Sequence, residues 1–330
     1  MEYSIDLANR FVSDYKLPIP ITNDEKLFNY YLKLFEKDFS SKTKYEKLVN
    51  LINNNFNGKP NDFLEEYYNI RENIIQAMLT NPHYLEFNNM DLNKYNIKDK
   101  PNVSSNNVYN CENIGKTFLS IDLKKANFQA LKFVNPKIIF DSDTYEDFIG
   151  KFTDLDYVKE SKYSRQVIFG KLNPKRHITV EKYIINEVRK LFEKYIDGNE
   201  NFKLISLSND EVVYECQNET IISSIDAVSL VNKIKKNIDI DVSIEMYGLE
   251  GYELYSENNR KANKKFFIKH NFLEYNKKMK CVPEPFYPII YKLYKSFPLN
   301  NNDRRIVYEG MNAYLTDDFH IRKILNNYGV

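Results

Sequence analysis

The spacing of apolar residues divides the chain into a helical first part and a mixed later part. From about Asp24 to Met78, apolar residues recur every three or four positions, which is the spacing of one helix face. Thr43-Lys-Tyr-Glu46 predicts a capping box at the start of the second helix, and Asn61-Asp62 predicts the cap of a third. Asn, Pro and polar residues dominate from about 81 to 115, which predicts a linker or an irregular surface segment.

Short apolar runs alternate with helical patterns after this segment. The runs predict strands at 117–121, 202–207, 212–216 and 241–247. The helical patterns predict helices at 126–133, 144–169 with a loop, 179–195 and 226–236. The order β-α-α-β-β-α-β predicts an α+β fold, in which an antiparallel sheet carries helices on one face.

The amino-acid composition excludes few classes of binding partner. The 330 residues are 42% hydrophobic, which is enough for a core, and 47 basic residues against 46 acidic ones leave a net charge of +1. A nucleic-acid-binding surface would therefore have to come from local clustering of basic residues. The wealth of Asn, Lys, Ile and Tyr, with no Trp and nine Gly, is typical of an AT-rich genome, such as that of a virus.

Several common classes of site are not expected. Cys111, Cys216 and Cys281 are far apart and form no CxxC pair, which argues against a disulfide framework and a zinc site and favours a reducing cytoplasm, the host's for a viral protein. The chain begins without a signal-peptide pattern and has no run of about 18 apolar residues, so no membrane partner is expected. It also lacks the GxxxxGK[ST] and GxGxxG nucleotide-binding loops.

Two acidic motifs stand beside predicted strands. Asp122 follows the apolar run 118–121, and Asp210 and Glu211 lie in the turn before the strand at 212–216. A carboxylate at the end of a buried strand is costly to desolvate unless it pairs with a cation. Two such groups suit the paired divalent ions that catalyse phosphoryl transfer. Structural roles stay open, because Asp122 also suits a helix N-cap and the Asp210-Glu211 pair also suits a turn.

These motifs resemble the palm of the family A DNA polymerases. Asp122-Leu-Lys-Lys-Ala-Asn-Phe128 is similar to motif A, and Ser208-Asn-Asp210-Glu211, followed by an apolar strand, is similar to motif C. Between them, Lys162-Tyr-Ser-Arg165-Gln-Val-Ile-Phe169-Gly170 resembles motif B. The order is that of the family, but the separation of motifs A and C is shorter and nearer to that of reverse transcriptases.

The resemblance implies template-dependent synthesis of nucleic acid, most simply a DNA polymerase that uses two-metal nucleotidyl transfer. Asp122, Asp210 and the backbone carbonyl of Leu123 would hold two Mg²⁺ or Mn²⁺ ions, and Glu211 would lie close to the primer end. The expected partners are a primer–template duplex, nucleoside triphosphates and possible replication or transcription proteins.

The resemblance also implies a nucleotide-binding site. Arg165 and Lys162 would contact the triphosphate, although Lys162 equally suits a solvated helix surface. Phe169 would stack against the sugar or base, with Asn127 and Phe128 close to the sugar. The family's usual residue before the motif C Asp is His, where this chain has Asn, and Asn127 replaces the usual sugar gate. The sequence therefore leaves the choice between deoxyribonucleotides and ribonucleotides open.

Basic residues cluster in two places. They are Lys124, Lys125, Arg260, Lys261, Lys264, Lys265, Lys269, Lys277 and Lys278. The second cluster alternates with aromatic residues, which suits a surface that contacts the phosphates and bases of a nucleic acid. An amphipathic element, with its aromatic residues in the core and its lysines in water, explains the same pattern.

The resemblance divides the chain into three regions. Residues 1–110 would form a helical, thumb-like or accessory region, 111–250 a palm with short fingers, and 251–330 a basic, nucleic-acid-contacting region. The alternative function is a catalytically degenerate palm that binds nucleic acid as an accessory subunit of a viral replication or transcription complex. A third hypothesis, chance similarity in a structural protein, requires Asp122 and Asp210 to lie far apart.

Overall fold

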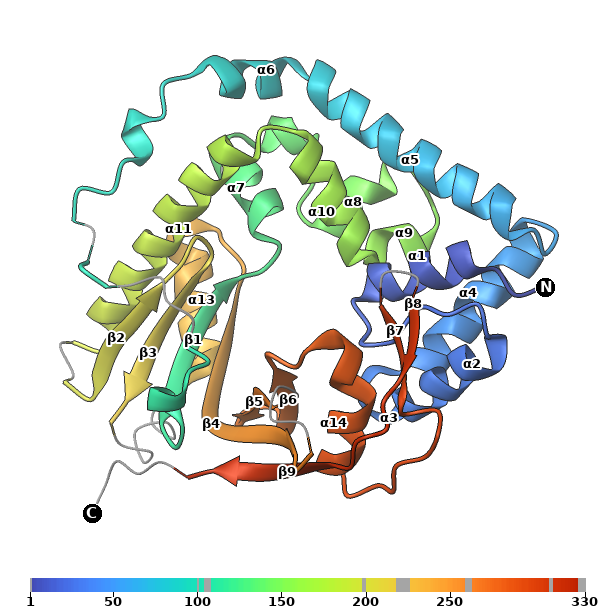
Figure 1. Ribbon diagram of the computed structural model, residues 1–330. Helices are drawn as coiled ribbons and strands as arrows, with labels where there is room; N and C mark the ends of the chain where they lie inside the picture. The colour runs from blue at the N-terminus through green and yellow to red at the C-terminus, as the bar shows by residue number, and fades with distance from the viewer. Residues whose placement is uncertain are drawn as a thin grey trace.

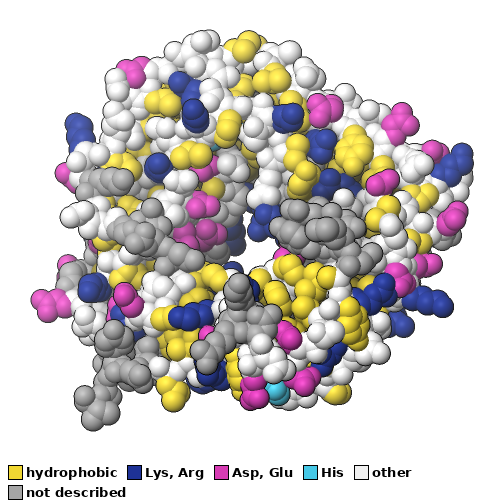
Figure 2. All heavy atoms as spheres, viewed as in Figure 1, with side chains coloured by type: hydrophobic (Ala, Val, Ile, Leu, Met, Phe, Trp, Pro, Cys, Tyr) yellow, Lys and Arg dark blue, Asp and Glu magenta, His cyan; other side chains and the backbone are white. Residues whose placement is uncertain are grey.

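The protein forms a ring of helices and strands around a central hollow (Figures 1 and 2). The computed structural model describes residues 2–99, 101–103, 108–197, 200–217, 226–258, 263–308 and 311–325. In Figure 1 a β-sheet forms one side of the ring, a helical arm forms the top, and the N-terminal helices form the side opposite the sheet. The C-terminal strands and a short helix form the base between them.

The first part of the chain is helical, as its apolar spacing predicts. Its helices are α1 (Ile5–Tyr15), α2 (Glu25–Leu34), α3 (Glu36–Phe39), α4 (Ser41–Asn55), α5 (Pro60–Thr80) and α6 (Pro82–Asn89), followed by the 3₁₀ turns η1 (Asn93–Tyr95) and η2 (Cys111–Asn113).

Three details of the expected N-terminal part are wrong. The capping box at Thr43 does not form, because α4 already begins at Ser41 and the Thr43 hydroxyl instead donates a hydrogen bond to Glu36 (2.5 Å). Helix α5 begins at Pro60, before the expected cap at Asn61, because proline suits the first helical position. The expected linker contains α6, which Asn81 caps by accepting backbone hydrogen bonds.

The later part is an α+β structure with an antiparallel sheet, as predicted. The strands are β1 (Thr117–Leu123), β2 (Phe202–Leu207), β3 (Glu211–Cys216), β4 (Val242–Ser256), β5 (Lys264–Asn271), β6 (Asn276–Lys280) and β9 (Phe319–Ile324). Their order is β2-β3-β1-β4-β5-β6, and β9 also pairs with β4. A separate hairpin consists of β7 (Arg305–Tyr308) and β8 (Met311–Tyr314).

Strand β4 is much longer than the predicted strand at 241–247. Its first half pairs with β1, and its second half pairs with β5 and β9. The expected regional boundary at residue 250 therefore falls inside a continuous strand. At Gly251 an added Cβ would collide with the Ile114 side chain, so glycine permits the close crossing of the chain over β4.

Helices cover one face of the sheet. They include α7 (Ala126–Val134), α11 (Pro174–Tyr195) and α13 (Ala227–Ile238), while η3 (Pro136–Ile139), α8 (Tyr145–Gly150), α9 (Asp156–Glu160) and α10 (Lys162–Lys171) form the arm. Alternate β1 residues, including Leu119 and Ile121, join the same buried core as the helix residues Leu131, Ile185 and Ile234. The opposite face carries a smaller apolar cluster that includes Phe118. The rest of this face carries polar side chains such as those of Ser120 and Asp122.

A buried polar cluster around one carboxylate attaches α1 to the arm. Asp14 is fully buried and forms an ion pair with Arg10 (3.2 Å). It accepts hydrogen bonds from Tyr67 on α5 (2.8 Å), Tyr157 on α9 (2.8 Å) and Ser161 (2.7 Å), which is the N-cap of α10. A single carboxylate thus connects α1, α5 and the consecutive helices α9 and α10.

A second buried carboxylate attaches α2 to the C-terminal base. Asp303 accepts a hydrogen bond from Tyr30 (2.5 Å) and pairs with Lys292 (2.8 Å) on α14 (Tyr287–Tyr294). Asp24 at the start of α2 pairs with Arg305 (2.8 Å). The turn η5 (Glu284–Phe286) leads into α14. The N-terminal helices therefore contact both the arm and the base, which closes the ring.

We expect Asp14→Ala to lower the free energy of unfolding by about 3 kcal/mol, because it leaves the buried Arg10 guanidinium without its counter-charge. Urea unfolding followed by circular dichroism measures the change. Glu66→Ala on the exposed face of α5 is the matched control and is expected to change stability by less than about 0.5 kcal/mol. Equal stabilities of the two variants would contradict the role assigned to Asp14.

Candidate functional site

The sheet brings the two predicted acidic motifs together. Asp122 on β1 lies directly opposite Glu211 on β3, and on its other side it lies opposite Ser243 on β4. The Leu123 N–H donates a hydrogen bond to the Asp210 carbonyl (2.9 Å). The chance-similarity hypothesis, which needs Asp122 and Asp210 far apart, is therefore wrong on this point.

The turn between β2 and β3 holds Asp210 and Glu211 in place. The Ser208 hydroxyl accepts a hydrogen bond from the Glu211 N–H (3.0 Å) and donates one to the Asp210 carboxylate (3.2 Å). The Ser120 hydroxyl on β1 donates to the Glu211 carboxylate (2.5 Å). Ser120 and Asp122 are two residues apart in a strand, so their side chains and Glu211 share one face of the sheet. This is the face without the helices.

The neighbouring acidic residues raise the cost of ionising Asp122. Burial and the neighbouring carboxylates Asp210, Glu211 and Glu245 raise the pKa of Asp122 to about 7. Figure 2 shows Asp and Glu side chains gathered on the sheet side of the central hollow, with Lys and Arg side chains across from them. Carboxylates crowded in this way favour a bound cation, because a cation relieves their repulsion.

Glu245 links this acidic face to the basic strands. Its carboxylate accepts hydrogen bonds from Lys269 on β5 and from Lys278 on β6, the latter at 2.9 Å. Burial alone would raise the pKa of Glu245, but these two lysines outweigh burial and lower it to about 2. Glu245 is therefore neutralised by its own partners.

The structure adds a carboxylate that the sequence motifs do not reveal. Glu181 on α11 is buried and accepts a hydrogen bond from the Asn127 amide (2.6 Å). Burial and the charge of Asp210 raise the pKa of Glu181 to about 7, against the effect of the Asn127 hydrogen bond. In the sequence, Glu181 is indistinguishable from the other charged positions of a long amphipathic helix.

Basic residues converge at the start of α10. Tyr15 at the end of α1 donates a hydrogen bond to Glu160 (3.2 Å), which places the next residue, Lys16, beside Lys162. Burial and the positive charges of Lys162 and Arg165 lower the pKa of Lys16. Burial also lowers the pKa of Arg165, whose guanidinium lies 5.6 Å from the centre of the Tyr145 ring. Lys16 was not predicted from the sequence, because no local pattern connects α1 with α10.

The expected aromatic contacts with a nucleotide are wrong for the conformation described. Phe169 is 1% exposed and packs against Phe148 and His177, and Phe128 is 2% exposed and packs against Tyr145 and Phe148. Both rings belong to the core that joins the arm to the sheet. They stabilise the arm and are not available for stacking on a sugar or base.

The basic residues predicted to contact nucleic acid have different surroundings. Lys269 is a clear correction, because it is 3% exposed and its ammonium group lies over the Tyr247 ring and binds Glu245. Lys125 pairs with Glu146. Arg260 and Lys261 lie outside the described residues. The remaining predicted lysines are exposed or half-buried, namely Lys124, Lys264, Lys265, Lys277 and Lys278.

The donor chemistry of the acidic face fits a hard divalent cation. Asp122 and Asp210 offer carboxylate oxygens. The backbone N–H of Leu123, the residue after Asp122, is hydrogen-bonded to the Asp210 carbonyl. As the side chains stand, no group of three His, Cys, Asp or Glu residues within the described ranges forms a ready metal-binding cluster.

Comparisons with protein-family models, with curated proteins and with solved structures give no significant match. The geometry of the site is therefore the basis for any functional conclusion. Among the residues described, no helix is both long enough and apolar enough to cross a membrane.

We expect the stability of the metal-free protein to fall as the pH rises from about 4 to about 7, because Asp122 is protonated more readily when folded than when unfolded. Asp122→Asn removes this contribution, so its stability advantage over the wild type is expected to grow between pH 5 and pH 8. Urea unfolding in EDTA at both pH values measures it. Asp143→Asn, at an exposed loop position, is the control. An Asp122→Asn effect that is the same at both pH values would contradict the assignment.

Proposed function

We propose that this protein is a template-dependent nucleic-acid polymerase, most simply a DNA polymerase, whose β-sheet acts as a polymerase palm. The observation that carries the proposal is the pairing of β1 with β3, which brings Asp122 and Glu211 together on the open face of the sheet and joins the Asp210 backbone to the residue after Asp122. Motifs A and C of the family A DNA polymerases supply the same residue types in the same order. A chain that met this pattern by chance would have no reason to join the two motifs.

The acidic face would provide the metal site of the reaction. Asp122 and Asp210, with the backbone carbonyl of Leu123, would hold two Mg²⁺ or Mn²⁺ ions, which activate the primer hydroxyl and stabilise the leaving pyrophosphate. Glu211 is held by Ser120 beside them and would face the primer end. The hydrogen bonds of the Ser208 turn fix the backbone of Asp210 before any ion binds, which reduces the ordering that ion binding requires.

The basic group at the start of α10 would receive the triphosphate. Lys16, Lys162 and Arg165 form no ion pair with an Asp or Glu among the described residues, and Glu146, whose charge acts on Arg165, is itself paired with Lys125. Their charge is therefore available to an anion. Helix α10, which carries Lys162 and Arg165, lies across the central hollow from the sheet (Figure 1). A nucleoside triphosphate between the two walls would place its charged groups against cations on one side and a metal site on the other.

A degenerate palm that only binds nucleic acid is the second candidate. It is favoured by the burial of Phe128 and Phe169. It is also favoured by the hydrogen bond to Glu181 that engages the Asn127 amide, which was expected to lie beside the nucleotide sugar. Such a protein would bind a primer–template duplex as an accessory subunit without extending it. Metal dependence separates the two candidates.

We expect the wild type to extend a labelled primer in Mg²⁺ or Mn²⁺, and Asp122→Asn and Asp210→Asn to lose at least about 100-fold of the rate, because each removes charge that the transition state needs. Extension assays on DNA and RNA templates, with each nucleotide set, measure this. Asp143→Asn is the control that keeps the same charge change outside the site. Wild-type binding of the duplex without any extension would favour the degenerate palm.

We expect Arg165→Ala and Lys16→Ala each to raise KM for the nucleotide about tenfold, because each removes a charge-assisted contact with phosphate. Steady-state extension kinetics at varied nucleotide concentration measure the change. Lys171→Ala, at the exposed end of the same helix, is expected to leave KM unchanged. If Lys16→Ala behaves like this control, the N-terminal helix does not take part in triphosphate binding.

A further inference from the structure

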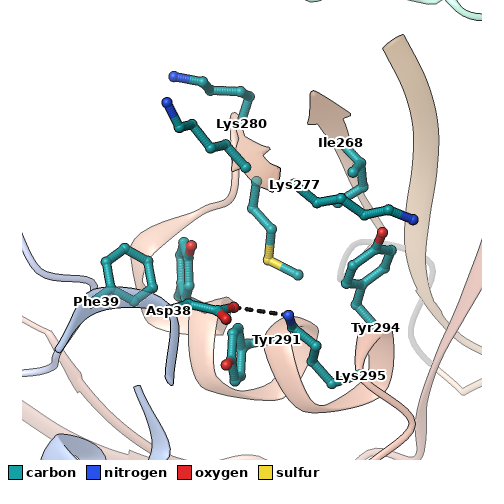
Figure 3. A pocket seen from close by; sticks show the side chains of 11 residues that line it. Asp38, Phe39, Ile268, Lys277, Lys280, Tyr291, Tyr294 and Lys295 are labelled. Carbon is teal, nitrogen blue, oxygen red and sulfur yellow. Dashed lines mark ion pairs between the residues drawn. The ribbon is translucent and has the colours of Figure 1, made fainter. Parts of the chain in front are cut away.

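A cavity of about 360 Å³ lies where β6, α14 and α3 meet (Figure 3). None of the sequence motifs predicts it, because α3 is far in sequence from β5, β6 and α14, which supply the other walls. Ile268 and Met279 supply apolar surface, and Phe39 closes the side formed by α3. Lysine side chains extend from the β6 side, while the Asp38–Lys295 ion pair lies on the α14 side.

One wall of the cavity is aromatic. Tyr287, Tyr291 and Tyr294 are spaced by four and three residues on α14, so their rings lie on one face of the helix. Tyr291 is buried against Phe35, with ring centres 5.0 Å apart. Tyr294 is half-buried at the outer end and meets Tyr252 edge to face at 5.6 Å. Tyr287 and Tyr294, which are only half-buried, offer ring surface to a planar ligand.

The cavity also carries surplus positive charge. Lys295 is neutralised by Asp38 (2.9 Å), and Lys278 is neutralised by Glu245 (2.9 Å). Lys277 and Lys280 also line the cavity, and within the described ranges neither has a carboxylate at ion-pair distance. Burial and the charge of Lys269 lower the pKa of Lys280, against the effect of Glu245 and Glu211, and its ammonium group lies 5.8 Å from the centre of the Tyr109 ring. An anionic group at this rim would relieve the repulsion.

We propose that this cavity binds one nucleotide of a single-stranded nucleic acid. The base would lie against the tyrosine wall, and its flanking phosphates would contact Lys277 and Lys280. Aromatic surface next to unpaired cations is the combination that proteins use to hold single strands with little sequence preference. A site that binds anions by charge alone would not require the aromatic wall. A pocket for an apolar ligand would not require the lysines.

The position of the cavity gives the bound strand a direction. Lys278 lines the cavity and also hydrogen-bonds Glu245 on the acidic face of the sheet. A strand that leaves the cavity past Lys278 therefore runs toward Asp122. This direction rests on the proposed polymerase function, whereas binding in the cavity does not require it.

The test is fluorescence anisotropy with a labelled oligothymidylate of about eight nucleotides, in EDTA so that the acidic face takes no part through metal. An abasic strand of the same length carries the same phosphates without bases. The wild type is expected to bind the thymidylate strand about tenfold more tightly than the abasic one, because base stacking on the tyrosines is lost without bases. Equal affinities would overturn the proposal, since they would reduce the cavity to an anion site.

Two variants separate the stacking from the charge. Tyr294→Leu is expected to remove most of the preference for the strand with bases while leaving abasic binding unchanged. Lys277→Ala/Lys280→Ala is expected to weaken both and to lower the salt-dependence slope by about 1.4, the loss of two phosphate contacts. Lys203→Ala/Lys236→Ala makes the same charge change at exposed positions on β2 and α13 and is expected to have no such effect.

Either variant behaving like this control would overturn the proposal, provided that circular dichroism shows each to be folded. Primer extension in the same proteins keeps the two inferences apart. A protein that binds the thymidylate strand through Tyr294 but never extends a primer would refute the polymerase and leave the cavity site intact. A protein that extends primers but binds both strands equally would do the reverse.

Discussion

The structure depends on the burial of β1 in the middle of the sheet. Both edges of this strand are hydrogen-bonded, to β3 and to β4, and its Leu119–Ile121 side packs in the core formed with α7, α11 and α13. A strand held in this way cannot slip by one residue without moving its apolar side chains out of the core. The orientation of Asp122 toward the open face is therefore a consequence of hydrophobic packing. The stability of the apolar core offsets the energetic cost of placing Asp122 next to other carboxylates.

The two buried carboxylates of the N-terminal region have a different role. Asp14 joins α1 to the arm and Asp303 joins α2 to α14, and each accepts a hydrogen bond from at least one tyrosine hydroxyl and pairs with a cation. Buried ion pairs add little net stability, but they are intolerant of misplacement. Their use at both junctions of the N-terminal helices favours a single closed arrangement of the ring, so that Lys16 stays beside α10 and α3 stays beside the C-terminal cavity.

The sequence allowed the local elements to be predicted well. Apolar runs located β1, β2 and β3 and the helix after β1, because these segments carry the period of their own structure. The acidic pair Asp122 and Asp210 was anticipated through its resemblance to known motifs, and the sheet pairing does bring the two residues together. Their catalytic and metal-binding roles stay predictions.

What the sequence could not provide was the surroundings of each side chain. Phe169 has the spacing of a nucleotide contact, yet His177 and Phe148 bury it, and Lys269 alternates with aromatic residues, yet it turns inward to Glu245. Lys16 and Glu181 had no local signal at all, because the residues that surround them are far away in the sequence. Lys16 lies beside Lys162, and Glu181 is affected by Asn127 and Asp210. Such contacts depend on how the elements pack, which no short pattern encodes.

The continuity of β4 has a consequence for how this chain can change over time. One strand carries Ser243 and Glu245 on the acidic face and then Tyr252 beside the C-terminal cavity, with no loop between them. Because successive side chains of a strand point to opposite faces, the insertion or deletion of one residue would turn every later position over. Descendants of this protein can therefore lengthen the loops at either end of β4 freely, but they can alter its interior only by substitution.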